Sequence, residues 1–234
     1  MNTASASSLP SAADRLRIGG LTRWTSIDFP GRLAAVVYLQ GCPWRCSYCH
    51  NPELLDATHE GRHPWAEVRD FLRARRGLLD GVVFSGGEPT LQAGLCDALD
   101  EVRSMGFETG LHTGGMYPER LAQLLPRLDW VGLDIKGPWE RIDEITGTRG
   151  CSPRVKASLC HLIDSGVAFE CRTTWGEELF AVGELHALSE QLASLGVRHW
   201  ALQQCRGPSP AAPPGAQEIA AFSARFERFE LRAA

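Results

Sequence analysis

The sequence of 234 residues has no excess of cationic charge. Its 24 lysines and arginines are outnumbered by 28 aspartates and glutamates, so the formal net charge is −4. Binding to a nucleic-acid backbone usually requires a basic arm or face, and no strongly basic segment stands out here. We therefore expect no nucleic-acid partner.

The sequence also lacks a long hydrophobic run. No stretch of about 18 apolar residues occurs, so we expect no transmembrane helix and no membrane partner. Residues 1–13 are rich in serine and alanine, without the basic start or apolar stretch of a secretory signal. These features predict a cytoplasmic protein. At roughly 150 residues per domain, we expect a disordered tail over residues 1–16 and one folded domain over residues 17–234.

Cysteine usage excludes a third class, the small disulfide-stabilised secreted proteins. The chain has eight cysteines, but it is long enough to bury a core and shows no export signal. Three of the eight, Cys42, Cys46 and Cys49, lie close together, and the other five are scattered. This clustering indicates metal chemistry rather than crosslinks.

Short β-branched or aromatic runs alternate with amphipathic stretches along the chain. The alternation predicts strands at 33–40, 81–85, 108–113, 130–136, 168–174 and 199–204, and helices at 64–75, 91–105, 118–124, 153–165, 182–195 and 217–229. Six strand-then-helix units imply a parallel sheet, because parallel neighbours need long crossovers. Six units are too few for a complete eight-unit barrel. A doubly wound open sheet and a curved, incomplete barrel both fit this pattern.

Two further segments are predicted from their turn residues. The pairs Gly19-Gly20 and Pro30-Gly31 indicate a small hairpin leading into the first strand of the alternation. Residues 206–214, which are rich in proline, are predicted to form a loop.

The clustered cysteines directly follow the first predicted strand, in the order Cys42-x-x-x-Cys46-x-x-Cys49. Iron–sulfur clusters ordinarily take four thiolate ligands. Three ligands would leave one iron open for a substrate, as an open position distinguishes catalytic from structural metal sites. A zinc loop completed by His50 or a distant cysteine is the alternative. His50 is badly placed to close the same site because it directly follows Cys49, so the spacing favours a cluster.

A second motif, Ser85-Gly86-Gly87-Glu88-Pro89, ends the strand predicted at 81–85. Paired glycines at the end of a strand let the backbone approach a ligand closely, and a carboxylate there can bind an ammonium group. A tight turn between strand and helix explains the motif equally well when it is taken alone. Its position after the cysteine loop makes the functional interpretation stronger.

The two motifs together resemble the signature of the radical S-adenosylmethionine (SAM) superfamily, CxxxCxxC followed by GGEP. Residues 25–32 (TSIDFPGR), 40–42 (QGC) and 48–52 (YCHNP) are similar to the activases of glycyl radical enzymes. Among these, the sequence most resembles the activating proteins of anaerobic ribonucleoside-triphosphate reductase. The pyruvate formate-lyase activating enzymes resemble it less closely. The resemblance covers about residues 18–206.

This resemblance implies a fold, two cofactors and a partner. The fold is an incomplete parallel (β/α)6 barrel, a partial TIM barrel. The implied cofactors are a [4Fe–4S] cluster held by Cys42, Cys46 and Cys49, and SAM bound to the open iron. Reductive cleavage of SAM would give a 5′-deoxyadenosyl radical that takes a hydrogen atom from a glycine of the partner reductase. Flavodoxin or ferredoxin would be the electron donor.

The resemblance also implies which residues hold SAM. Gly86, Gly87 and Glu88 would line its methionyl amino group, and Tyr48 and His50 would lie near the adenine. Thr113 matches the family pattern and is expected to face SAM.

Two strand ends complete the expected site. Asp134 and Lys136 lie on one face of their strand by alternation, and Lys136 is one of only two lysines in the chain. By resemblance, Lys136 would bind the SAM carboxylate and Asp134 the ribose, whereas a buried Asp–Lys pair is the structural alternative. Arg172, near the end of the strand at 168–174, is a further candidate because ligands of α/β proteins bind at the carboxyl ends of strands.

The sequence departs from its relatives at His112, where they often carry an aspartate that helps bind a monovalent cation. An imidazole is a poor substitute for a hard oxygen ligand, so no cation site is predicted and His112 is expected to be hydrogen-bonded. Cys96, Cys160 and Cys171 are expected to be small buried side chains. Two functional alternatives stand beside the reductase activase. They are activation of another glycyl radical enzyme and small-molecule chemistry of the 7-carboxy-7-deazaguanine synthase type.

Overall fold

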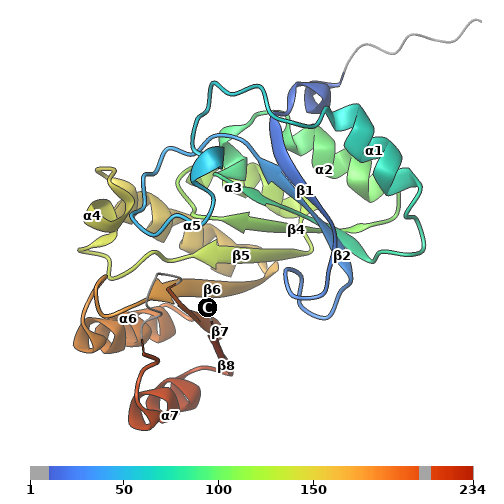
Figure 1. Cartoon of the computed structure of the whole chain (residues 1–234). Helices are drawn as coiled ribbons and strands as arrows, with labels where there is room; N and C mark the ends of the chain where they lie inside the picture. Colours follow the sequence, from blue (N-terminus) through green and yellow to red (C-terminus); the bar gives the residue numbers. More distant parts are fainter. Residues whose placement is uncertain (1–10, 206–211, 234) are drawn as a thin grey trace, which may run out of the picture.

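The computed structural model describes residues 11–205 and 212–233, which fold around one eight-stranded sheet (Figure 1). The strand order is β1-β2-β3-β4-β5-β6-β7-β8, with β1 antiparallel to β2 and all later neighbours parallel. The strands are β1 (Ile18–Thr25), β2 (Ala34–Leu39), β3 (Gly81–Gly86), β4 (Glu108–Thr113), β5 (Trp130–Asp134), β6 (Ala168–Trp175), β7 (His199–Gln204) and β8 (Arg228–Arg232).

Helices connect successive parallel strands, which confirms the incomplete (β/α)6 barrel. The helices are α1 (Trp65–Arg73), α2 (Leu95–Ser104), α3 (Pro118–Leu124), α4 (Ile142–Thr146), α5 (Cys151–Ser165), α6 (Val182–Ser194) and α7 (Ala216–Arg225). β1 and β8 form the two edges of the sheet, so the barrel is open between them. Among the described residues, no helix combines the length and apolar character that crossing a membrane requires.

The C-terminal segment differs from the sequence prediction. The helix predicted at 217–229 ends at Arg225, and the chain then returns as β8 alongside β7. Phe226 and Phe229 both pack on Trp200 of β7, with ring centroids 5.2 and 5.4 Å apart from it. Amphipathic spacing could not separate these two aromatic residues from the helix, because their burial depends on a distant tryptophan.

The predicted disordered tail is wrong for residues 11–16. A short 3-10 helix, η1 (Ala12–Arg15), begins after Ser11, whose hydroxyl accepts the amide of Ala13 at 3.2 Å. Ala13 is fully buried and Leu16 nearly so, and both belong to the main core. Residues 1–10 of the predicted tail and 206–211 of the predicted loop lie outside the described residues.

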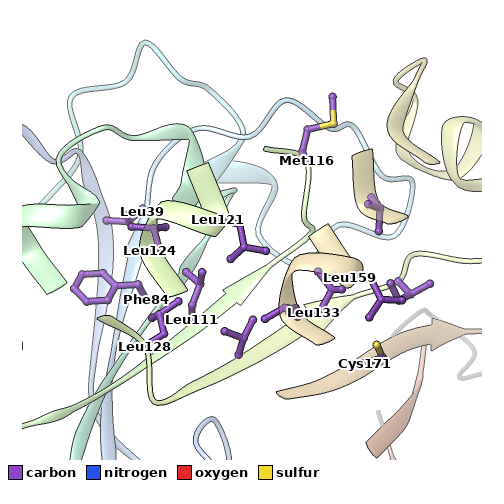
Figure 2. Packing of buried hydrophobic residues seen from close by; sticks show 14 of the residues in the cluster. Leu39, Phe84, Leu111, Met116, Leu121, Leu124, Leu128, Leu133, Leu159 and Cys171 are labelled. Carbon is purple, nitrogen blue, oxygen red and sulfur yellow. The ribbon is translucent and has the colours of Figure 1, made fainter. Parts of the chain in front are cut away.

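The main core lies between the outer face of the sheet and the helices. Alternate strand residues such as Leu39, Phe84, Leu111 and Leu133 point to this layer, where leucines of α3 and α5 also pack (Figure 2). The inner face of the sheet has a second, smaller apolar cluster. It contains Phe29, Ala34, Val36, Val83 and Trp130, with Phe29 stacked on Trp130 at a centroid distance of 5.8 Å. This cluster occupies the inner face toward the amino ends of the parallel strands, and polar groups occupy the carboxyl ends.

The scattered cysteines are only partly as expected. Cys171 is fully buried in β6, Cys96 is half-buried, and Cys160 is exposed on α5. The expectation for Cys160 is wrong because the buried stripe of α5 runs through Val155 and Leu159, which places the next residue toward solvent.

Candidate active site

A cavity of about 170 Å³ opens at the carboxyl ends of the parallel strands. Every site residue predicted from the sequence lines it. These are Cys42, Cys46, Tyr48, Cys49, His50, Gly86, Gly87, Glu88, Thr113, Asp134, Lys136 and Arg172. The fold therefore brings together side chains that are up to 130 positions apart in the sequence, since parallel strands present their carboxyl ends at one edge.

The cysteine loop that follows β2 is anchored on both sides. The amide of Cys42 donates to the Leu55 carbonyl at 3.2 Å, and the amide of Arg45 donates to the Thr146 carbonyl at 2.8 Å. Thr148 Oγ1 also donates to the Pro43 carbonyl at 3.1 Å. These hydrogen bonds hold the loop in place, and its three free thiols line the cavity.

The thiols are suited to a metal cluster. Burial raises the pKa of the Cys42 thiol to about 12 and also raises the pKa of Cys46. A buried thiolate therefore needs a metal to stabilise it. Among the described residues, no three cysteine, histidine or acidic side chains are arranged to hold a single metal ion.

Gly86, the last residue of β3, and Gly87, which follows it, allow that strand to approach the cysteine loop. A Cβ on Gly87 would lie 2.3 Å from the Gly41 carbonyl oxygen. Gly86 has φ +117°, and a Cβ there would lie 2.4 Å from backbone atoms of Leu39. The amide of Gly87 donates to Leu39 O, and the amide of Glu88 donates to Gly41 O, both at 2.9 Å. The end of β3 is thus joined to the segment that enters the cysteine loop.

Glu88 connects the same strand end to β4. It is 2 % exposed, and its Oε1 accepts the hydroxyl of Thr90 at 2.6 Å, the amide of Thr90 at 3.0 Å and the hydroxyl of Thr113 at 2.7 Å. Its Oε2 accepts the amide of Gly114 at 2.8 Å. Burial raises the pKa of Glu88, and the donors oppose that rise. A carboxylate has about four acceptor positions, so Oε2 retains capacity for a cationic donor.

Asp134, Lys136 and Arg172, from the β5 and β6 part of the cavity wall, form an ion-pair cluster. Lys136 Nζ donates to Asp134 Oδ2 at 2.9 Å, and Arg172 Nε donates to Asp134 Oδ1 at 2.8 Å. Burial alone would raise the pKa of Asp134, but the two cations outweigh it and hold that pKa well below its usual range. Burial also opposes the charge of Lys136, yet the neighbouring carboxylate raises its pKa. The pairing predicted as the structural alternative is present, and both of its members still line the cavity.

Neighbouring residues position this ion-pair cluster. Gly132 leaves room for Arg172, because a Cβ there would lie 2.8 Å from the guanidinium carbon. The hydroxyl of Tyr48, in the cysteine loop, donates to the Lys136 carbonyl at 3.4 Å. The centre of the Tyr48 ring lies 5.8 Å from Lys136 Nζ. The cluster is therefore tied to the cysteine loop as well as to the sheet.

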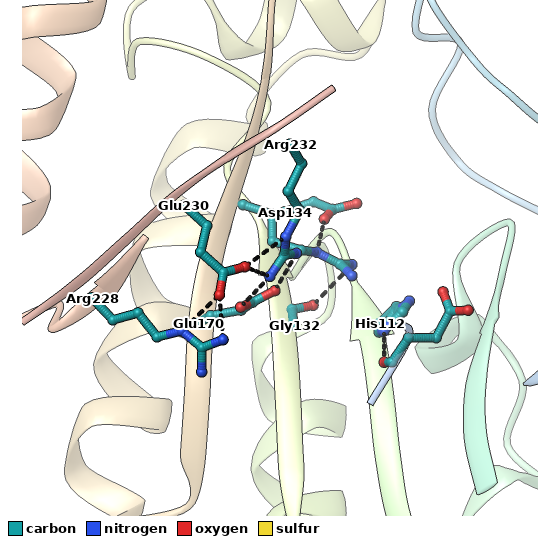
Figure 3. A network of polar contacts seen from close by, with 9 residues as sticks. His112, Gly132, Asp134, Glu170, Arg228, Glu230 and Arg232 are labelled. Carbon is teal, nitrogen blue, oxygen red and sulfur yellow. Dashed lines mark hydrogen bonds and ion pairs between the residues drawn. The ribbon is translucent and has the colours of Figure 1, made fainter. Parts of the chain in front are cut away.

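His112 is a hydrogen-bonded residue near the end of β4, as predicted. Its Nε2 lies 2.8 Å from the Asp28 carbonyl oxygen, and its ring meets Trp130 edge-on at a centroid distance of 5.5 Å. Figure 3 shows the ring near Gly132 and beside the charged groups of β5, β6 and β8. Burial, with a smaller effect from Arg172, lowers the pKa of His112 to about 3. The imidazole is consequently neutral in the folded protein.

Some cavity residues were not predicted to be site residues. Thr174 and Gln203, which are register partners on β6 and β7, line the cavity together with Trp44 and Ser85. Strand alternation places Thr174 on the same face as Arg172, so this signal was available in the sequence. The position of Gln203 depends on the pairing of β6 with β7, which the sequence does not specify.

A family model described as the radical SAM superfamily matches residues 36–173, from β2 into β6, including the whole cysteine loop. This chain belongs to the radical SAM superfamily. Its cofactors are accordingly a [4Fe–4S] cluster and SAM, and the free thiols and the cavity fit that pair.

Relatives of this radical SAM protein include activating enzymes of glycyl radical enzymes. The candidate glycyl-radical enzyme activating enzyme MJ1227 of Methanocaldococcus jannaschii is 32 % identical over 171 residues, which cover 68 % of each chain. A pyruvate formate-lyase-activating enzyme of Clostridium pasteurianum is 35 % identical over 125 residues, so the match spans about half the length of that relative (52 %). The crystal structure of QueE from Escherichia coli has the same fold, with a TM-score of 0.57, 22 % identity and coverage of 94 % of this chain and 93 % of that chain.

Proposed function

We propose that this radical SAM protein installs a glycyl radical on anaerobic ribonucleoside-triphosphate reductase. The observation that carries the proposal is that one cavity brings three free thiols of one loop together with an acidic group after β3 and a cationic group after β5. The similarity of residues 25–32 and 48–52 to the activases, and the homology to glycyl-radical-enzyme-activating enzymes, support the type of partner. Flavodoxin or ferredoxin is the proposed electron donor.

Cys42, Cys46 and Cys49 are the proposed ligands of the cluster. Three thiolates leave one iron for the amino and carboxylate groups of SAM. When bound, the cluster supplies the electron that cleaves SAM into methionine and a 5′-deoxyadenosyl radical, which takes a hydrogen atom from the partner's glycine. The anchored cysteine loop holds the thiols at the cavity, and the open side of the sheet between β1 and β8 gives a protein segment room to enter.

The remaining residues are proposed to bind and orient SAM. Gly86 and Gly87 keep the backbone close, and Glu88 Oε2 accepts the methionyl ammonium. Lys136 has three donor hydrogens and uses one on Asp134, so others serve the SAM carboxylate. Asp134 is held ionised by its two cations and accepts ribose hydroxyl groups.

Four residues are proposed to lie around the rest of the ligand. Tyr48 and His50, which flank Cys49 in the cavity wall, lie beside the adenine. Thr113 faces SAM next to Glu88, and Arg172 keeps Asp134 oriented toward the cavity.

A second candidate partner is pyruvate formate-lyase. The 35 % identity with the Clostridium pasteurianum activating enzyme favours it specifically. Both partners present a glycine to the same radical chemistry, so the cavity residues would have the same roles. The two candidates differ only in which protein docks at the open side of the sheet.

The test begins with anaerobic reconstitution of the cluster, followed by electron paramagnetic resonance (EPR) of the reduced protein with and without SAM. A [4Fe–4S]⁺ signal that changes on adding SAM, together with formation of 5′-deoxyadenosine, is the expected result. Each candidate partner is then added, and a glycine-centred doublet identifies the correct one. Turnover with a pterin-like substrate and no doublet would instead favour the small-molecule alternative. A colourless protein that binds zinc contradicts the proposal.

A further inference from the structure

Trp44, in the middle of the cysteine loop, carries a buried hydrogen-bond donor without a partner. Its side chain lines the cavity, the residue is 3 % exposed, and its Nε1 has no hydrogen-bond acceptor among the described residues. Buried indole N–H groups usually find a partner. Leaving a buried donor unsatisfied is destabilising. An acceptor that enters the cavity would therefore be stabilised by this donor.

The indole ring is held so that Nε1 cannot easily turn to another acceptor. A Cβ on Gly114 would lie 2.1 Å from Cζ3 and 2.4 Å from Cη2 of Trp44, so the ring packs directly on the Gly114 backbone. Those ring atoms belong to the edge opposite Nε1. Gly114 is fixed in turn by its amide, which donates to Glu88 at 2.8 Å. The packing of the ring on Gly114 therefore limits how far the indole can rotate.

The backbone around Trp44 is equally constrained. Arg45 donates from Nη1 to the carbonyl oxygens of Trp44 and Cys42, both at 2.8 Å. The next amide, that of Arg45, is bonded to Thr146. The loop therefore cannot shift to satisfy the indole without breaking several hydrogen bonds.

The position of Trp44 identifies the kind of acceptor. The residue lies between Cys42 and Cys46, two of the proposed cluster ligands, so a sulfur atom of the cluster is the expected acceptor. The charged groups of SAM have other candidate partners, Glu88 after β3 and Lys136 after β5. We propose that Trp44 donates its indole N–H to a sulfur atom of the cluster and thereby raises the reduction potential of the cluster. Hydrogen bonds to cluster sulfurs stabilise the more negative, reduced state.

The inference rests on the cluster of the proposed function but not on the partner enzyme, so its test needs neither SAM turnover nor the reductase. Trp44→Phe removes the N–H and keeps an aromatic ring against Gly114. Trp139→Phe is the matched control, because Trp139 is 5 % exposed and packs under Lys156 rather than lining the cavity. Both variants are reconstituted anaerobically beside the parent protein, and iron and sulfide per chain are measured.

The decisive readout is the midpoint potential of the SAM-free cluster, followed by EPR during a redox titration. Trp44→Phe is expected to bind as much iron as the parent and to have a lower midpoint potential, whereas Trp139→Phe matches the parent. Pulsed EPR after exchange into heavy water is expected to show a deuterium coupling in the parent that Trp44→Phe loses. An unchanged midpoint with the coupling retained overturns the proposal. A change in the midpoint potential of Trp44→Phe that occurs only when SAM is present also overturns the proposal, because the acceptor is then SAM.

A measurement on the unsubstituted ring covers the case in which Trp44→Phe binds less iron. The parent is labelled with the heavy nitrogen isotope in its indole rings, and the reduced cluster is expected to show a coupling to that nitrogen. Absence of this coupling overturns the role of Trp44. A parent protein that forms no [4Fe–4S] signal contradicts the proposed function itself, which separates the two failures.

Discussion

Thr113 donates its hydroxyl to Oε1 of Glu88 at 2.7 Å and so joins the end of β4 to the end of β3. The next amide, that of Gly114, donates to the other oxygen of the same carboxylate. Glu88 therefore holds two neighbouring strand ends in place while it faces the cavity. Gly86 and Gly87 let the chain turn sharply after β3, and this turn directs the carboxylate of Glu88 toward the end of β4.

Substitution Glu88→Gln is expected to weaken SAM binding by about ten- to a hundredfold, the effect of losing one charged hydrogen bond. The amide replaces one acceptor oxygen by a donor and removes the charge that would balance the SAM ammonium. Binding is measured by titrating SAM against the EPR signal of the reduced cluster. The exposed Glu53→Gln serves as control and should leave the affinity unchanged. Equal affinities in Glu88→Gln and the parent would contradict the assignment.

Cys46→Ala should lose the cluster. With two thiolates left in the loop, iron per chain after reconstitution is expected to fall to background, and cleavage of SAM should stop. Cys160→Ala is the matched control because that thiol is exposed on α5 and does not line the cavity. Full iron content in Cys46→Ala, or its loss in Cys160→Ala, would show that the cluster lies elsewhere.

Asp134→Asn should destabilise the fold by about 3 kcal/mol, because it leaves Lys136 and Arg172 as two partly buried cations without their shared carboxylate. Asp100→Asn breaks an exposed pair with Arg127 and should cost less than about 1 kcal/mol. Urea unfolding of the two variants beside the parent gives the comparison. Similar losses of unfolding free energy in both variants would mean that the ion-pair cluster of Asp134 stabilises the fold no more than a surface pair does.

His112 predicts a pH dependence of stability. Its pKa is about 3 in the folded protein and near the ordinary 6.5 in the unfolded chain, so below pH 6.5 the unfolded state binds more protons. Stability from this group is present above that value and declines as the pH falls, by about 1.4 kcal/mol between about pH 7.5 and 5.5. Over this pH range the free energy of unfolding should fall by about 1.4 kcal/mol more in the parent than in His112→Gln. The glutamine retains a donor for the Asp28 carbonyl. Parallel pH profiles would contradict the burial of a neutral imidazole.

Gly87→Ala should lower the free energy of unfolding by about 2 kcal/mol and reduce the iron content. The added Cβ would lie 2.3 Å from the Gly41 carbonyl oxygen and push β3 away from the cysteine loop. Gly183→Ala in α6 meets no atom within 4 Å and should be neutral or stabilising by up to about 1 kcal/mol. Urea unfolding and iron analysis check both variants. A Gly87→Ala protein that matches the parent would show that the loop tolerates displacement.

The sequence by itself determined the features that depend on local pattern. Strand–helix alternation predicted the parallel order, and the spacing of Cys42, Cys46 and Cys49 predicted a thiolate loop that the structure places beside the cavity. Because parallel strands end at one edge, the positions of Glu88 and Lys136 at the ends of two predicted strands were enough to predict that both lie at that edge, and their roles toward SAM were implied by the family resemblance.

Tertiary structure alone decided which residues meet. β8 replaces the end of a predicted helix because Phe226 and Phe229 pack on Trp200, and residues 11–16 are ordered because Ala13 and Leu16 enter the core. The contact of Trp44 with Gly114 likewise depends on how far the cysteine loop lies from β4. Periodicity specifies the face on which a side chain lies, but strand register and loop packing specify its neighbour, and those arise from contacts between segments distant in the chain.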